Sequence, residues 1–449
     1  MELIHIPAEI LEHIFAFLDG QSFCRIKLVC KHWHETGKRM QVRNSLWKQF
    51  CIKEVPEHIL EDILSFKSVL LTDKIIDWCA IYKKWFHAKM IRTSPYWKKL
   101  IKGFCYNPVT CVKISGSFVI TGHSNGCLCI WNQYNGELCQ KILCHLKTIT
   151  DMALVDLLNL GSYYGSEELP WAHHHIITVS KDYYIQVKSL LEPITISNSN
   201  EMLNFHSDVL CGVRVYGNQF AVSCRDNTFT IWNMHLEYKP YFHLDVSLVR
   251  SITGPRDIFF NFGFWRNEVY CVSRKGGLNV YSKDKEEWIE KKHFMILYSN
   301  ECLESVVSVT AVFLFRNQII IMLTADGKMV VYVNEQMVRH HYLMKYLHTV
   351  LVTVALSGTI LALGGENGKL FLYHIPDDDH LGSLQLSNPA FALQLSDASI
   401  IAIDILHDND SPVIVAATNE SIYVIKWYNI HKSHQEVKRR DVSHLFKMH

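Results

Sequence analysis

The start of the chain carries apolar side chains at helical spacing. From Pro7 to Leu18 they return every three or four positions, and the pair Asp19–Gly20 then interrupts the pattern. At 100° per residue these apolar positions cover an arc of about 160°, and proline suits the first turn of a helix. The pattern therefore predicts an amphipathic helix that ends near Leu18.

Helical periodicity continues through the first hundred residues. A second helix is expected over Ser22–Gly37, since serine is a good N-cap and glycine commonly ends a helix. A third is expected over Val42–Phe50. Weaker helical signals follow over Ile59–Leu71 and Lys74–Met90, which indicate a helical linker.

From Val109 onward the apolar period changes from helical to alternating. Short runs of alternating residues are separated by turn residues, as in antiparallel β structure. One pattern recurs: turn residues, an apolar position, any residue, an aliphatic residue and usually an aromatic. The seven copies are Asn125–Trp131, Asp182–Lys188, Asp226–Trp232, Lys275–Tyr281, Asp326–Tyr332, Asn367–Tyr373 and Asn419–Ile425.

These copies recur at the spacing of a four-stranded repeat, about 40–50 residues, which is typical of β-propellers. One longer step accommodates an insertion near Leu157–Trp171. Asn-Gly and Asp-Gly pairs open several copies, and both residues of such pairs close tight hairpins. An irregular β-sandwich would not explain a register kept seven times. We therefore expect seven blades.

Composition narrows the class of protein. The chain has 449 residues, 49% apolar and 20% charged, which is enough for two domains with real cores. A net charge of +1 argues against nucleic-acid binding through bulk electrostatics. We also expect no membrane span, because no apolar run reaches about 18 residues and the N-terminus lacks the pattern of a signal peptide. The expected location is the cytoplasm, the nucleus or both.

Neither cysteine nor histidine spacing predicts a metal site. The fourteen cysteines include no C-x-x-C pair and no zinc-type spacing, and they read as small core residues of a reducing compartment. Three adjacent histidines, His173–His175, cannot all face one ion. No cofactor and no metal are expected, and the scattered carboxylates suggest no catalytic constellation.

The β repeats resemble WD40 repeats. The clearest copy, G-H-S-N-G-C-L-C-I-W-N, has Asn132 where the family has the aspartate of its Trp-Asp pair. Histidines that open such repeats are matched by His145, His206 and His348. Several copies carry tyrosine in place of tryptophan, so the repeats are diverged.

The N-terminal segment resembles an F-box. The matching positions are Ile6–Pro7, Ile10–Leu11, Ile14–Phe15, Phe17–Leu18, Leu28–Val29–Cys30, Trp33 and Leu46–Trp47. With the WD40-like repeats, this order is similar to that of the F-box/WD-repeat proteins. The expected organisation is α+β and multidomain: an F-box over residues 1–50, a helical linker over 51–103, a seven-bladed WD40-type propeller over 104–430 and a tail over 431–449.

The resemblance implies a non-catalytic substrate receptor of an SCF ubiquitin ligase. In that family the F-box binds the adaptor Skp1, which connects it to a cullin–RING ligase, and the propeller binds a protein substrate that is sometimes phosphorylated. Three short helices also have too little interior to bury a 160° arc. The expected adaptor contacts are Pro7, Ile10, Leu11, Ile14, Phe15, Leu18, Leu28, Val29, Cys30 and Trp33.

Two further points stay open in the sequence. A propeller scaffold, with its F-box-like helices serving as an intramolecular cap, is the alternative function. The segment E-V-K-R-R-D (Glu436–Asp441) is either a basic signal or part of a strand that closes the last blade.

The propeller carries a candidate substrate site. In a blade of strands a to d, the b–c turns and d–a loops share one rim, where ligands of WD-type propellers commonly bind. We expect four cations there that could hold an acidic or phosphorylated segment; structural use of Arg before a turn Asp is the alternative. They are Lys181, Arg225, Arg250 and Arg274.

Overall fold

The structure is a computed structural model of the chain. Among the residues it describes, no helix combines the length and the apolar composition needed to cross a membrane. The described residues are 6–64, 76–102, 107–156, 174–189, 201–203, 205–239, 241–254, 259–266, 268–273, 277–284, 287–295, 309–334, 336–408 and 411–428.

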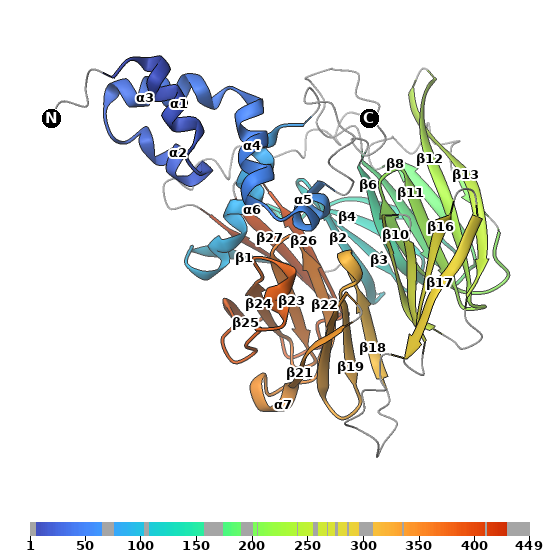
Figure 1. The fold of residues 1–449 in the computed structure, drawn as a ribbon. Coiled ribbons are helices and arrows are strands. Elements are labelled where there is room, and N and C mark those ends of the chain that lie inside the picture. The colour runs from blue at the N-terminus through green and yellow to red at the C-terminus, as the bar shows by residue number, and fades with distance from the viewer. Residues whose placement is uncertain are drawn as a thin grey trace.

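Helices form the N-terminal part and seven four-stranded sheets form the rest, which confirms the expected fold class (Figure 1). Short helical segments also lie between strands of the propeller. The N-terminal helices are α1 (Ala8–Ala16), α2 (Gly20–Ile26), α3 (Lys31–Gln41), α4 (Asn44–Glu54), α5 (Glu57–Leu64), α6 (Trp78–Ala88) and the 3-10 helix η3 (Lys89–Arg92).

The expected helix over Ser22–Gly37 is wrong, because it is two helices. The Asp19 side chain accepts a hydrogen bond from the Ser22 backbone N–H at 2.7 Å, so α2 already begins at Gly20. Cys30 is extended and starts α3. Gly37 lies inside α3, where an added Cβ would stand 3.1 Å from Lys27 Cγ. This glycine allows close packing of α2 and α3 and does not end a helix.

The helices share one apolar core that runs from α1 to α6. Phe23, Trp47 and Phe50 are each within 6 Å of one another by ring centroid. Trp47 also contacts Tyr82 of α6, with centroids 5.5 Å apart. The F-box-like helices and the first linker helices are therefore one packed unit.

The strands follow one another around a ring. The first strands of neighbouring blades contact each other in sequence, and the first strand of blade one contacts that of blade seven, so first strands surround the axis. Blades one to four are β2 (Val109–Ser115), β3 (Phe118–His123), β4 (Cys127–Asn132), β5 (Leu138–Leu143); β6 (Ile149–Asp156), β7 (His174–Ser180), β8 (Ile185–Ser189), β9 (Glu201–Leu203); β10 (Leu210–Tyr216), β11 (Gln219–Cys224), β12 (Thr228–Lys239), β13 (Tyr241–Thr253); β14 (Phe259–Trp265), β15 (Glu268–Ser273), β16 (Gly277–Asp284) and β17 (Glu287–Met295).

Blades five to seven complete the ring, and three short helices lie in the described connections between their strands. They are β18 (Val309–Leu314), η5 (Arg316–Gln318), β19 (Ile320–Thr324), β20 (Lys328–Val333), β21 (Gln336–Tyr342), α7 (Leu343–Tyr346); β22 (Leu351–Ser357), β23 (Ile360–Gly365), β24 (Lys369–His374), η6 (Asp378–Leu381), β25 (Phe391–Gln394); β26 (Ala402–His407), β27 (Pro412–Ala417) and β28 (Ser421–Trp427).

The fourth strand of blade seven comes from the segment that precedes the propeller. Strand β1 (Tyr96–Lys102) pairs antiparallel with β28, from Tyr96 opposite Trp427 to Lys102 opposite Ser421. Residues 96–102 therefore form a strand. The expectation that they belong to a helical linker is wrong. The expected tail, 431–449, lies outside the described residues.

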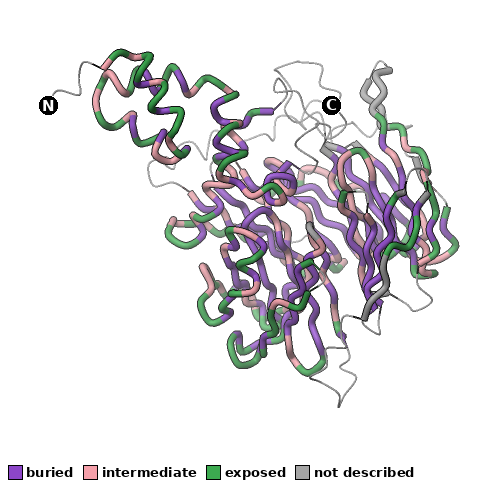
Figure 2. The backbone as a smooth tube through the Cα atoms, in the orientation of Figure 1, coloured by how far each residue is buried: buried purple, intermediate pink, exposed green. Residues whose placement is uncertain are grey.

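Burial differs between the inner and outer strands of a blade (Figure 2). In blade one, the second and third strands, β3 and β4, are buried along their whole length, whereas the outer strand β5 is mostly half-buried or exposed. Because the strands alternate in direction, a–b turns and c–d turns form one rim, the a–b rim. The b–c turns and d–a loops form the opposite one, the b–c rim.

Candidate functional site

Helix α1 divides its apolar side chains between the core and the surface. Leu11 and Phe15 are fully buried, and the Phe15 ring meets Trp33 of α3 edge-on, with centroids 5.2 Å apart. Ile10 and Ile14 are 52% and 46% exposed. One face of α1 therefore builds the helical core, and the neighbouring face remains apolar and in contact with solvent.

Other large apolar side chains are exposed on the same helices. Phe17, directly after α1, is 81% exposed, and Leu28, between α2 and α3, is 86% exposed. His32 of α3 hydrogen-bonds the Ile6 carbonyl at 3.1 Å, which sets the start of α3 beside the start of α1. We call the following set the apolar surface: Pro7, Ile10, Ile14, Phe17, Leu28, Val29 and Val42.

Ion pairs fix the direction of α1 against α3. Glu12 accepts hydrogen bonds from Arg39 Nε at 2.9 Å and Arg43 Nη2 at 2.7 Å. The hydrogen bond from Arg43 is the largest influence that lowers the pKa of the Glu12 carboxyl, so this group stays ionised. The apolar surface thus lies on helices held by both a core and polar links.

The expected adaptor contacts separate into three groups. Leu11 and Phe15 lie inside the helical core and cannot reach a partner while the helices stay folded, so they leave the set of expected contacts. Phe17 and Val42 were not expected as contacts, although Phe17 belongs to the same helical arc. The exposed members are Pro7, Ile10, Ile14, Leu28 and Val29, and the half-buried ones are Leu18, Cys30 and Trp33.

A half-buried polar contact joins the F-box-like helices to α6. Glu54, at the end of α4, accepts hydrogen bonds from the Gly20 backbone N–H at 2.8 Å and from Tyr82 Oη at 2.7 Å. A Cβ on Gly20 would stand 2.5 Å from the Tyr82 ring. Glycine is therefore required at this point, where α2 approaches α6.

Helix α5 carries the helical unit onto the a–b rim of the propeller. Glu61, with a fully buried side chain, takes two hydrogen bonds from Arg266 of blade four, at 2.7 and 2.8 Å. Asp62 binds Arg316 of blade five at 2.7 Å and the Gly358 backbone N–H of blade six at 2.5 Å. One turn of helix thus contacts three adjacent blades.

Arg316 is the most buried cation of this contact. Its side chain is 1% exposed and lies between Asp62 and Asp378, whose oxygens are 2.7 and 3.1 Å away. His58 of α5 also approaches Asp378, at 3.3 Å. A buried guanidinium requires such partners because an unpaired charge is costly to remove from water.

The opposite rim carries two of the four expected cations. Lys181 and Arg225 are exposed in the b–c turns of blades two and three, and neither has an ion-pair partner within the described part of the chain. Arg250 lies inside outer strand β13 opposite Ile231, so its expected place on the rim is wrong; the d strand runs on to Thr253. Arg274 lies outside the described residues.

A third cation lies on the same rim, beside the b–c turn of blade two. Lys147, in the d–a loop that enters blade two, has its Nζ 5.3 Å from the centre of the Tyr183 ring. The neighbouring Leu146 is 82% exposed. The b–c rim of blades two and three therefore displays cationic side chains beside apolar ones.

Buried polar groups hold the d–a loop of blade two against its b–c turn. His145 Nδ1 lies 3.1 Å from both carboxylate oxygens of Asp182, and His145 Nε2 lies 2.9 Å from Thr178 Oγ1. The Leu146 backbone N–H donates to Asp182 at 2.9 Å. Burial lowers the pKa of His145. These groups stabilise the rim and account for the histidine that opens this repeat.

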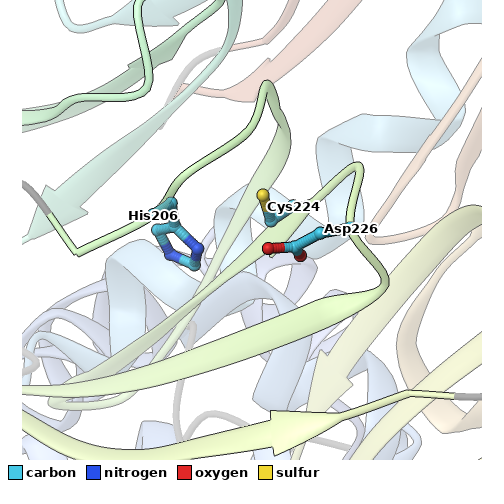
Figure 3. A group of neighbouring side chains, drawn as sticks. All are labelled: His206, Cys224 and Asp226. Carbon is cyan, nitrogen blue, oxygen red and sulfur yellow. The ribbon is translucent and has the colours of Figure 1, made fainter.

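Blade three has a related cluster of different chemistry. His206 of the d–a loop, Cys224 at the end of β11 and Asp226 of the b–c turn point toward one another (Figure 3). Burial raises the pKa of the Cys224 thiol to about 12 and lowers that of His206. Burial acts to raise the pKa of Asp226, but hydrogen bonds from Thr228 and Cys224 outweigh it and hold the value low. No spacing of cysteine and histidine residues predicted this cluster.

Comparison with known proteins supports the division into two parts. Residues 3–53 match the family described as F-box-like. Over 49 residues, 10% of this chain, the sequence is 45% identical to human F-box only protein 48, covering 28% of that protein. Over 147 residues, 31% of this chain, it is 24% identical to F-box/WD repeat-containing protein 7 of Drosophila melanogaster, covering 11% of it. The matches thus span about a quarter or less of these relatives.

The propeller is similar to a solved structure. The structure of U3-55K covers 73% of this chain and 98% of its own, with a TM-score of 0.52 and 13% sequence identity. At that identity the likeness concerns the fold alone. With the helices, the seven sheets and the sequence relatives, it leads to one conclusion: the chain combines an F-box-like domain at its N-terminus with a seven-bladed WD40-type propeller.

Proposed function

We propose that this chain is the substrate receptor of an SCF-type ubiquitin ligase. Its F-box-like domain docks a Skp1-type adaptor and through it a cullin–RING ligase, and its propeller binds a protein substrate for ubiquitination. The chain itself is non-catalytic in this role, which it performs in the cytoplasm, the nucleus or both.

The observation that carries this proposal is the apolar surface. Ile10, Ile14 and Leu28 are about half or more exposed on a helical unit whose core is already complete without them. Burying a side chain of this size stabilises a complex by about 1.5–3 kcal/mol. Large exposed apolar groups gathered on one small unit are characteristic of a protein interface.

The contacts of α5 also favour a receptor over an intramolecular cap. The helical unit meets the propeller through Glu61 and Asp62, and the apolar surface takes no part in those contacts. The apolar surface is therefore available to another protein. The b–c rim, with Lys181 and Arg225, lies on the side opposite α5 and is the proposed substrate site for an acidic or phosphorylated segment.

Adaptor binding is tested with the double variant Ile14→Asp/Leu28→Asp in the full chain, co-expressed with Skp1. Placing a carboxylate in an apolar interface costs about 2 kcal/mol or more, which corresponds to about a thirtyfold loss of affinity. The control is Leu143→Asp, because Leu143 is 64% exposed on outer strand β5 of the propeller. We expect calorimetry to show weakened binding for the first variant and unchanged binding for the control.

Equal Skp1 binding by wild type and the double variant, with both folded by circular dichroism, would instead favour the propeller scaffold.

Substrate capture is tested separately. Affinity capture from cells with proteasome and cullin activity blocked compares wild type with Lys181→Glu/Arg225→Glu. Proteins that both chains retain equally would refute the b–c rim cations as the substrate site.

A further inference from the structure

The cluster in blade three offers three different ligand atoms at close range. One ligand atom each of His206, Cys224 and Asp226 lies within 4.8 Å of the other two (Figure 3). We propose that these three residues bind a zinc ion. Imidazole nitrogen, thiolate sulfur and carboxylate oxygen are all ligands that zinc accepts, and the thiolate disfavours calcium and magnesium.

Blade two shows what the same positions do without a cysteine. Ser180 and Cys224 are equivalent, since each ends the second strand of its blade and pairs with the first residue of the first strand. With serine, His145 Nδ1 pairs directly with Asp182 at 3.1 Å. The histidine and the aspartate of blade two therefore satisfy each other.

Blade three lacks that direct bond. Within the described residues no hydrogen bond reaches His206 Nδ1, and Asp226 Oδ1 accepts from the Thr228 backbone N–H at 2.9 Å. The Cys224 thiol lies within 4.8 Å of the Asp226 carboxylate. Replacement of serine by cysteine thus leaves a ring nitrogen free beside a thiol and a carboxylate.

The His206 ring is held in the orientation that a metal ligand needs. Its Nε2 lies 2.9 Å from Thr230 Oγ1, and Thr230 Oγ1 also accepts a hydrogen bond from Trp232 Nε1 at 3.0 Å. When Nε2–H donates to Thr230, the lone pair lies on Nδ1 and faces the cluster. Such an outer partner on the second ring nitrogen is characteristic of metal-binding histidines.

One side of the cluster is open to solvent. Cys224 is fully buried and His206 is 6% exposed, whereas Asp226 is exposed on the b–c rim. Three protein ligands and an open fourth position suit a tetrahedral ion that keeps a water molecule or takes a group from a bound protein. Arg225, between two of the ligands in sequence, is exposed in the same b–c turn as Asp226.

The test uses Co²⁺ as a spectroscopic substitute for Zn²⁺ on the purified, metal-free full chain. Binding through Cys224 gives a thiolate-to-cobalt charge-transfer band, and Zn²⁺ removes this band by competition. Cys224→Ser, which copies blade two, is expected to abolish the band. The control is Cys211→Ser, because Cys211 is an exposed cysteine of the same blade; it is expected to keep it.

A second variant tests the outer partner. Thr230→Val keeps all three ligands and is expected to weaken Zn²⁺ binding about tenfold or more in competition with a chromogenic chelator. Circular dichroism verifies that each variant is folded. A wild-type chain without the charge-transfer band, or a Cys224→Ser chain that binds Zn²⁺ as tightly as wild type, would overturn the proposal and leave the cluster as a hydrogen-bonded feature of the blade.

Discussion

Two glycines of the b–c turns share a left-handed backbone but differ in their surroundings. Gly126 has φ +82° and an added Cβ would stand 1.9 Å from the His145 carbonyl oxygen, whereas Gly327 has φ +75° and nothing within 4 Å. An L-residue with positive φ costs about 1 kcal/mol. Gly327→Ala should cost about that much, and Gly126→Ala about 3 kcal/mol or more, because the loop must also move.

Thermal denaturation of the two variants measures this difference. We expect the Gly126→Ala midpoint to fall clearly further than that of Gly327→Ala. Equal shifts would mean that backbone strain alone matters and that the d–a loop at His145 yields easily.

Which side of a helix is buried depends on contacts that periodicity does not describe. Leu11 and Ile14 belong to the same apolar arc, yet Leu11 is fully buried and Ile14 is 46% exposed. The difference arises from where α3 lies against α1, which is a tertiary contact. The pattern thus predicted the apolar arc of α1 but not which of its members are buried in the helical core and which stay exposed.

At the scale of the elements, substitutions in α5 test which interactions attach the helical unit to the propeller. Glu61 and Glu57 both approach Arg266, at 2.7 and 3.4 Å, but their side chains are 0% and 67% exposed. Glu61→Gln removes a buried charge partner and should cost about 2 kcal/mol, less than a fully buried pair because Arg266 is 38% exposed. Glu57→Gln should cost about 0.5 kcal/mol or less.

Hydrogen exchange of the α5 amides reports the result directly. We expect faster exchange in α5 for Glu61→Gln, with protection of the inner strands unchanged. Similar exchange in both variants would show that apolar packing, rather than the ion pairs, holds α5 on the a–b rim.

Elements were predictable where the signal was local. Alternating residues and turn pairs such as Asn125–Gly126 lie within one blade, so seven blades could be counted from the sequence. Strand β1 could not be found in this way, because its partner β28 lies at the other end of the propeller sequence. The run Y-W-K-K-L-I-K also follows a helical region and has no turn pair of its own.

At the scale of the molecule, β1 closes the ring of blades. Ile101 is 1% exposed and packs with Ile422 and Val424, whereas neighbouring Leu100 is 39% exposed on the other face of the strand. Ile101→Ala should destabilise the propeller by about 2–5 kcal/mol, and Leu100→Ala by about 1 kcal/mol or less.

Thermal denaturation followed by tryptophan fluorescence compares the two variants in the full chain. A lower midpoint for Ile101→Ala, with Leu100→Ala near wild type, is expected from a buried closing strand. Equal midpoints would indicate that the ring is stable without β1.

The two rims of the propeller are occupied by different groups. Helix α5 occupies the a–b rim over blades four to six through Arg266, Arg316 and Gly358. The b–c rim, with Arg225 and the His206–Cys224–Asp226 cluster, lies on the opposite side. A partner on the apolar surface and a substrate on the b–c rim would therefore bind without competing for the same residues.

The pairing of β1 with β28 also sets an order of events during synthesis. Ribosomes produce β1 before the other strands of the propeller and β28 after them, so the edge of β1 lacks its partner until the strands of all seven blades have been made. The F-box-like helices emerge earlier still and share a core of their own. The helical unit, with its apolar surface, can thus fold before the ring of blades is able to close.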